Sequence, residues 1–346
     1  MTNKPIKIKA TDDSDRTAMG DYIKRVDDTN QPAPVIRFAS ALGTQKVAAA
    51  LSDRFKVLKS LGASDACEFY LARGSGNEPV VLKVLSGSAA RDFRQRELFR
   101  LEAHAASRLS HKNIVKTGEA ESVNGIYFCV AEQTAAAQTL RDLLSRTGWL
   151  DLAQAVSIIN QIADALTYAH SREVLHLRLQ PEKILVDQNG VVRITDFGID
   201  AGQQSGWAHA ERSRRLEAQY QSAEQMCGAS LDQRSDLYSL GVLLFEMLTD
   251  RLPFDSEDAE HIRRRHRVKH APLPPHVLSC EVPEAVSRVV MGLLEKNPNK
   301  RFSNAKVFQM TLNRLMSLDA DAEAIEDDVP LVEADVLSSY AVDVIE

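Results

Sequence analysis

The chain has 346 residues, of which 44% are hydrophobic and 26% are charged. This composition is typical of a globular protein and excludes collagen-like, fibrous and wholly disordered chains. The longest nearly uncharged apolar run, 237–245, is far shorter than the about 20 residues that a membrane-spanning helix needs. The N-terminal residues lack the apolar core of a secretory signal, and the four cysteines are scattered without a CxxC pair. We therefore expect a cytoplasmic protein with no membrane contact, no disulfide framework and no zinc site.

The charge is distributed unevenly along the chain. Residues 319–346 contain ten acidic residues and no Lys or Arg. The net charge is −6, so removing these ten negative charges leaves +4 for residues 1–318, which is too weak to predict nucleic-acid binding. We define residues 317–346 as an acidic C-terminal tail.

The acidic tail also carries apolar residues between its acids: Val329, Leu331, Val332, Val336, Leu337, Tyr340, Val342, Val344 and Ile345. Two interpretations stay open. The tail is either a short segment that orders on docking, to a signalling partner or to the basic body of this protein, or a tail with no dedicated partner.

Residues 1–54 show no sustained periodicity and predict a flexible extension with one short helix near 45–52. The next 80 residues predict strands broken by Gly-rich turns, and one amphipathic helix with apolar residues at 93, 98, 101, 105 and 109. The predicted strands are 55–61, 68–73, 80–85, 114–119 and 126–131, and the predicted helix is 91–109.

The pattern becomes mainly helical after residue 139. Helices are predicted at 140–146, 152–170, 237–249, 286–295 and 304–316, with a small hairpin formed by 184–187 and 191–194. The run 237–249 is apolar nearly all round and predicts a buried central helix. The fold class is therefore α+β with two lobes: a small lobe (55–133) with an antiparallel sheet and one helix, and a larger, mainly helical lobe (134–316).

Several motifs identify a family. Lys83 lies alone in the apolar strand VVLKVL, and Glu102 follows 19 residues later on the predicted helix. Further motifs follow in order: VLHLRLQPEKILVD (174–187), ITDFGID (194–200), YQSAEQ (220–225), LDQRSDLYSLGVLLFEML (231–248) and EKNPNKRF (295–302). In this order and spacing, residues 55–316 resemble the Hanks-type Ser/Thr protein kinase family, particularly its bacterial members.

The resemblance assigns roles to individual residues. It makes Gly62, Lys83, Glu102 and Glu132 candidates for nucleotide binding, and Asp196 a possible metal ligand. It also implies three structural residues, which are Glu224, Asp236 and Arg301. Two plainer interpretations stay open: Lys83 and Glu102 form only a structural ion pair, and Asp196 only bonds to the loop backbone.

The sequence departs from the family pattern in the glycine-rich loop. The family's G-x-G-x-x-G falls on Gly62, Ser64 and Cys67, so only the first glycine is present. Glycines there let backbone N–H groups approach the phosphates. We expect the side chains of Ser64 and Cys67 to obstruct that approach.

The catalytic loop departs further. Leu177 stands where the family has the Arg that grips a phosphorylated activation loop. Arg178 replaces the Asp that accepts the proton of the substrate hydroxyl, and Gln180 replaces the Lys that steadies the phosphoryl group. Lys183 replaces the Asn that holds the second magnesium ion. In the activation segment, Glu217 replaces the Thr that helps to seat the substrate.

Because the departures concentrate on chemistry while the framework residues match, we interpret the chain as a pseudokinase, a signalling scaffold or allosteric partner. ATP binding is predicted to be weak or absent, and to depend little on Mg²⁺. The alternative is an ATP-binding Ser/Thr kinase with residual or unconventional phosphotransfer. The basic segment HIRRRHRVKH (261–270) is interpreted as a solvated face in preference to a nucleic-acid site.

Overall fold

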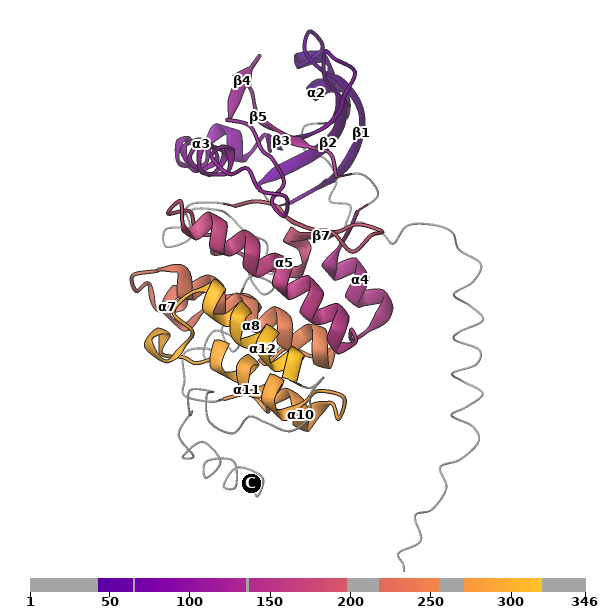
Figure 1. Ribbon diagram of the computed structural model, residues 1–346. Coiled ribbons are helices and arrows are strands. Elements are labelled where there is room, and N and C mark those ends of the chain that lie inside the picture. The colour runs from indigo at the N-terminus through magenta and orange to yellow at the C-terminus, as the bar shows by residue number, and fades with distance from the viewer. Residues whose placement is uncertain (1–42, 65, 135–136, 198–217, 255–270, 319–346) are drawn as a thin grey trace, which may run out of the picture. The chain divides into compact units, whose positions relative to one another are not determined.

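A computed structural model describes residues 43–64, 66–134, 137–197, 218–254 and 271–318 (Figure 1). The chain divides into residues 1–36 and residues 37–346, and every described residue belongs to the second unit. The predictions for residues 1–42, Glu217, the basic segment 261–270 and tail residues 319–346 lie outside the described residues.

The small lobe contains, within the described residues, a five-stranded sheet in the order β1-β2-β3-β5-β4, and each pair of neighbours is antiparallel. Helix α3 packs on one face of this sheet and helix α2 on the other. The elements are α2 (Thr44–Ala50), β1 (Lys56–Ala63), β2 (Cys67–Arg73), β3 (Pro79–Leu85), α3 (Phe93–Ser107), β4 (Glu121–Val123) and β5 (Ile126–Glu132).

The alternation of side chains along β3 places Lys83. Leu82 and Val84 are fully buried in the core on the α2 side of the sheet. Since successive side chains of a strand point to opposite faces, Lys83 lies on the α3 side. Its Cα partners in the neighbouring strands are Phe69 and Cys129.

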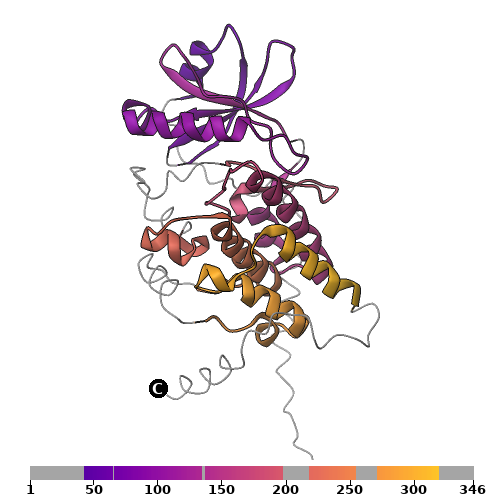
Figure 2. The same ribbon diagram turned by 60° about the vertical axis from the view of Figure 1, so that its left-hand side comes forward.

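The large lobe is mainly helical (Figures 1 and 2). Helix α8 is buried along most of its length and contacts α5 and α11, while α12 packs on α5. A small sheet of order β6-β7-β8 lies beside α4. The elements are β6 (Gln138–Thr139), α4 (Leu140–Thr147), α5 (Leu152–His170), η2 (Pro181–Lys183), β7 (Ile184–Val186), β8 (Val192–Ile194), α7 (Ala223–Cys227), α8 (Gln233–Thr249), α10 (Pro275–Leu278), α11 (Glu284–Leu293) and α12 (Ala305–Leu318).

This architecture is the two-lobed α+β fold that the sequence predicts, with three local corrections. The predicted strand 114–119 does not form, and this segment makes only isolated bridges at Ile114 and Thr117. The fifth strand is β4 instead. The apolar character of Ile114 and Val115 reflects burial, because these residues lie beside the large-lobe strand β8, where Val115 N donates to Ile194 O.

The second correction concerns the buried face of α3. Phe93, predicted on the apolar face, is 66% exposed, whereas Phe99 and Ala103 are buried against the sheet. The third concerns the start of the domain. Val47 and Leu51 are buried at 0% and 1% exposure in the small-lobe core, so the folded domain begins before residue 55. None of the described helices is long and apolar enough to cross a membrane.

Candidate functional site

The catalytic-loop segment (residues 176–183) is bound through its backbone by Asp236 of α8. Asp236 is fully buried and accepts hydrogen bonds from His176 N at 2.9 Å and Leu177 N at 2.6 Å. Leu177 has a φ of 60°, a left-handed conformation that is unfavourable for a side chain branched beyond Cβ. The two hydrogen bonds that Asp236 accepts help to hold Leu177 in this conformation, so the aspartate fixes the backbone of the loop.

His176 supports the same segment in its neutral form. Burial lowers its pKa to about 4. Its Nε2 lies 3.0 Å from Thr195 O, its Nδ1 accepts from Arg178 N at 3.3 Å, and its ring packs edge-on against Phe197. One donor nitrogen and one acceptor nitrogen match the neutral tautomer with the proton on Nε2.

Asp196 is bound by two lysines. Lys83 Nζ lies 2.8 Å from Oδ1, and Lys183 Nζ lies 2.5 Å from Oδ2. Burial alone would raise the pKa of Asp196, but the two ammonium groups outweigh it and hold the pKa well below its usual range. Asp196 is therefore a carboxylate whose two oxygens are both engaged by cations.

Glu102 is bound mainly by Arg178, which reaches across from the catalytic loop to α3. Arg178 Nη2 donates to Glu102 Oε1, while Lys83 Nζ is 3.9 Å from Glu102 Oε2. The predicted Lys83–Glu102 pair is thus present only at long range. Arg178 is the nearer cationic partner of Glu102, and Lys83 lies closer to Asp196 than to Glu102.

We call these five side chains the cleft network: Lys83, Glu102, Arg178, Lys183 and Asp196. They form a continuous chain of ion pairs that joins the small lobe to the large lobe. Three are cations and two are anions, which leaves a net charge of +1. Every anion in the network already has at least one cationic partner.

The cleft network does not fit a magnesium ion. Mg²⁺ needs oxygen ligands, and both oxygens of Asp196 accept from ammonium groups. The second metal-ligand position of the family holds the cation Lys183. Among the described residues, no group of three or more His, Cys, Asp or Glu side chains could hold a metal ion.

The network also lacks a proton acceptor at the expected place. The guanidinium of Arg178 has donors and no acceptor, and it is not deprotonated in proteins. Gln180 lines a small pocket together with Tyr220 and Ser239, and it carries no charge. Arg178 therefore offers no acceptor for a proton, and Gln180 offers neutral amide donors without the positive charge of the family's lysine.

The turn between β1 and β2 is closed by its own hydrogen bonds. Ser64 N donates to Cys67 O at 2.7 Å, and Cys67 N donates to Ser64 Oγ at 3.2 Å. The Cys67 side chain is buried in the core against α3, and burial raises the pKa of its thiol to about 11. Cys67 pairs with Leu85 on the same side of the sheet as Lys83, and the expected obstruction by Ser64 and Cys67 stays a prediction. The N–H groups of Ser64 and Cys67 are both occupied within the turn.

Two sequence candidates lie apart from the cleft network. Gly62 has a φ of 131° and takes part in the irregular pairing of β1 with β2. Glu132 ends β5 with an exposed side chain, and its N donates to Lys116 O. Within the described part of the chain, the hydrogen bonds of these two residues go to other neighbours than the five charged side chains.

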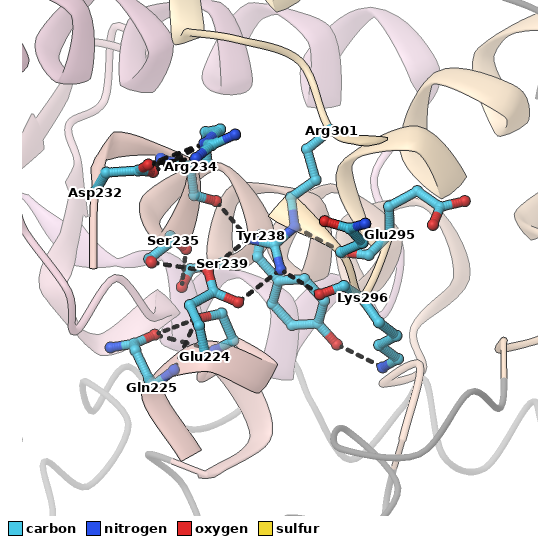
Figure 3. A network of polar contacts seen from close by, with 12 residues as sticks. Glu224, Gln225, Asp232, Arg234, Ser235, Tyr238, Ser239, Glu295, Lys296 and Arg301 are labelled. Atoms are coloured by element: carbon cyan, nitrogen blue, oxygen red, sulfur yellow. Dashed lines mark hydrogen bonds and ion pairs between the residues drawn. The ribbon is translucent and has the colours of Figure 1, made fainter. Parts of the chain in front are cut away.

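Figure 3 shows the pair that anchors the segment after the activation loop. Arg301 donates to both oxygens of Glu224, at 2.6 and 2.8 Å, and Ser235 Oγ donates to the same carboxylate. The Arg301 guanidinium also lies over the Tyr238 ring, at 5.0 Å. Glu224 and Arg301 thus form an ion pair that joins α7 to the segment before α12.

Sequence reasoning missed two polar side chains near this framework. Lys296 donates to Tyr238 O–H at 3.0 Å (Figure 3), and burial together with Arg301 lowers its pKa to about 7. Arg141 of α4 binds Glu182 at 2.9 Å and Glu246 at 2.6 Å. The two partners of Arg141 are 41 and 105 residues away in sequence, so no local pattern indicates these contacts.

Comparison with known proteins agrees with this geometry. A family model described as the protein kinase domain matches residues 55–312. The chain is 31% identical over 272 residues to the serine/threonine-protein kinase PrkC of Bacillus subtilis, covering 78% of this chain and 41% of that protein. It is 34% identical over 271 residues to the serine/threonine-protein kinase PknB of Mycolicibacterium smegmatis, covering 77% of this chain and 43% of that protein.

The chain thus spans less than half the length of these relatives. Among solved structures, the PknI kinase domain of Mycobacterium tuberculosis is similar with a TM-score of 0.60. The similarity covers 80% of this chain and 99% of that one at 22% identity, a level that supports the fold alone.

Proposed function

Since the chain belongs to the protein kinase family, we propose that it keeps the family's scaffold without transferring phosphate, and that it acts by binding a signalling partner. The observation that carries this proposal is the pair of lysines on Asp196. They use the carboxylate oxygens that the family offers to a metal ion.

The chemistry of the catalytic loop supports the same proposal. Loss of a positioned general base typically lowers a rate by about 10²- to 10⁴-fold. Here a cation, Arg178, occupies that position and is bound to Glu102. A reacting hydroxyl would meet donors on this side of the cleft, and no described side chain of the cleft network is available to accept its proton.

For nucleotides, the cleft network supports weak binding that depends little on Mg²⁺. Lys83 and Lys183 carry positive charge toward the place where phosphates lie in the family, but a phosphate must compete with Asp196 for both. We expect ATP to bind no tighter than tens of micromolar, roughly −6 kcal/mol. Calorimetry with ATP in EDTA and then in excess magnesium measures this. Tight binding that appears only with magnesium would contradict the proposal.

The enzymatic test uses the purified whole chain, labelled ATP and a panel of protein acceptors. We expect no transfer above background from the natural chain or from Arg178→Asp, because Gln180 and Lys183 remain. Arg178→Asp/Gln180→Lys/Lys183→Asn restores the family residues and serves as the positive comparison. Transfer by the natural chain that Asp196→Ala abolishes would overturn the proposal.

The second candidate is an ATP-dependent Ser/Thr protein kinase with residual or unconventional activity, located in the cytoplasm like the first. The comparisons favour this candidate over an inactive protein, because the relatives at 31% and 34% identity are named serine/threonine-protein kinases. The same transfer assay distinguishes the two.

The proposed partner is a protein, and not a nucleic acid or membrane. A pull-down with the whole chain tests it, and the framework-disrupting variant Arg301→Ala provides the matched control. We expect the partner to be lost with Arg301→Ala and kept with Asp196→Ala, because binding would need the fold and not the cleft chemistry. Loss of the partner with Asp196→Ala would contradict a purely scaffolding role.

A further inference from the structure

We propose that residues 319–346 of the acidic tail dock, within the same chain, onto the outer face of α3. We define this α3 outer face by its exposed residues Arg91, Phe93, Arg94, Arg100 and Arg108. The proposal concerns a contact that the kinase fold does not itself require, and it holds whether or not the cleft binds a nucleotide.

The outer face of α3 is positively charged. Residues 91–108 contain five arginines and three acids. One of the acids, Glu102, is buried toward the cleft and bound by Arg178. Of the other two, Asp92 caps the helix by accepting from Arg94 N, and Glu97 pairs with Arg100. Four exposed arginines and two acids therefore lie on this side of residues 91–108, a net charge of +2.

The same face presents an ordered aromatic ring. Phe93 is 66% exposed. The Arg96 guanidinium lies 5.8 Å from its ring centroid and 5.6 Å from that of Tyr127, and it donates to Ala90 O at 2.8 Å. An exposed ring held by a cation favours a ligand that offers both apolar and acidic side chains.

The tail matches this face in charge and in composition. The 28 residues 319–346 contain ten acids, no Lys or Arg, and interleaved Val, Leu, Ile and Tyr side chains. Its length is also sufficient. An extended chain of 28 residues reaches roughly 90 Å, and a compact domain of this size has a radius of gyration of about 19 Å. Starting from the end of α12 at Leu318, the tail can therefore reach any face of the domain.

Docking at this face would have a consequence for the cleft. The helix that carries the outer arginines also carries Glu102 on its inner side, where Arg178 binds it. A tail bound to the outer face of α3 would add to the Arg178–Glu102 ion pair, which holds the helix on its inner side. Because both contacts would act on one helix of 15 residues, docking of the tail would increase how firmly α3 is held against the large lobe.

Hydrogen–deuterium exchange on the whole chain at low salt tests the proposal, with the peptide 91–108 as the readout. Glu326→Gln/Asp327→Asn/Asp328→Asn removes three tail charges without shortening the chain. We expect this variant to exchange several-fold faster in 91–108 than the natural chain. We also expect 0.3 M salt to remove most of the difference, because exposed charge pairs are screened at about that ionic strength.

A charge swap identifies the docking site. In an Arg94→Glu/Arg100→Glu background, we expect the tail substitutions to have no further effect, and Glu326→Lys/Asp327→Lys/Asp328→Lys to restore protection of 91–108. The matched control Arg146→Glu/Arg288→Glu changes the charge equally on exposed residues of α4 and α11 and should leave the tail effect intact. If Arg94→Glu/Arg100→Glu does not fold, the milder Arg94→Gln/Arg100→Gln replaces it, and the tail substitutions should then have a smaller effect than in the natural chain.

Three results would overturn the proposal. The first is unchanged exchange in 91–108 when the tail charges are removed. The second is a tail effect that persists in the Arg94→Glu/Arg100→Glu background. The third is a tail effect that is lost instead when Arg263→Glu/Arg264→Glu changes the basic segment 261–270, which would place the tail on that segment.

Discussion

At the scale of single residues, Lys183 has the largest effect on what the cleft can bind. Its ammonium group occupies the Oδ2 side of Asp196 at 2.5 Å, so a divalent cation there would face a fixed positive charge. Charges of like sign at a few ångströms repel strongly in a site with little water. One side chain thus accounts for the predicted loss of magnesium dependence.

We predict that Lys183→Asn increases the magnesium-dependent part of ATP binding. Asn offers an oxygen in place of the ammonium group and releases one oxygen of Asp196. A ligand that binds only the native state raises the melting temperature. The ATP-induced rise should therefore become larger with magnesium than with EDTA. Lys300→Asn, at an exposed lysine of the 3₁₀ helix η4 (Pro298–Lys300), is the control, and an equal rise in both conditions would contradict the prediction.

His176 predicts a loss of stability in mild acid. Its pKa is about 4 in the folded chain against an ordinary value of 6.5. Between these values the unfolded chain binds the proton and the native chain does not. The contribution of neutral His176 to the unfolding free energy is therefore fully present above pH 6.5, and it is lost as the pH drops toward 4. From pH 7.5 to pH 5, we expect about 2 kcal/mol of the unfolding free energy to be lost through it.

Urea unfolding of the natural chain and of His176→Gln over this pH range measures the loss. The variant should lose about 2 kcal/mol less, because Gln does not titrate. Parallel profiles for the natural chain and His176→Gln would show that His176 does not titrate in this way.

At the scale of elements, α8 and α11 pack as closely as their backbones allow. A Cβ added to Gly241 of α8 would lie 2.6 Å from Leu293 Cβ and 3.4 Å from the Leu293 carbonyl carbon. Contacts below 3 Å force one helix to move, and here the neighbour is a rigid part of α11. The glycine is therefore required by the close approach of the two helices, although it lowers helix propensity.

We predict that Gly241→Ala destabilises the chain despite its gain in helix propensity. Overpacking of a core typically lowers stability by about 1–3 kcal/mol, and the alanine recovers about 1 kcal/mol. Chemical unfolding should show a net loss. Gly292→Ala is the matched control, because its Cβ would meet only a side-chain atom of Phe302 at 3.4 Å. A stabilised Gly241→Ala protein would contradict the prediction.

At the scale of the whole kinase-like domain, the Arg178–Glu102 pair joins the two lobes. Arg178 belongs to a large-lobe loop and Glu102 to α3, 76 residues away in sequence. The Glu102 side chain is 8% exposed and that of Arg178 is 27% exposed. A pair with this burial holds α3 toward the large lobe without any nucleotide in the cleft.

We predict that breaking this pair loosens the domain. Arg178→Met should lower the unfolding free energy by roughly 1.5–3 kcal/mol, the range for hydrogen bonds to charged groups, because Lys83 is too distant to replace the guanidinium fully. A double-mutant cycle with Glu102→Gln measures the coupling. Arg172→Met, an exposed arginine of the large lobe, is the control. A coupling energy near zero would mean that the pair does not join the lobes.

The two lobes and most of the helices and strands follow from local patterns in the amino-acid sequence. Helix 152–170 was predicted with its observed ends, and the strands around Lys83 to within two residues. These signals are local, because a period of two or 3.6 residues and a Gly-rich turn are visible within a short window. The replacements at Arg178, Gln180 and Lys183 were visible in the same way.

Tertiary structure alone decided which charges meet. Nothing in the sequence near Glu102 indicates that Arg178 binds it, or that Lys183 shares Asp196 with Lys83. The sequence also misplaced Phe93, because a helix of low amphipathicity does not show which side faces a sheet. Ion pairs between distant segments depend on the closure of long loops and on burial, which no local pattern records.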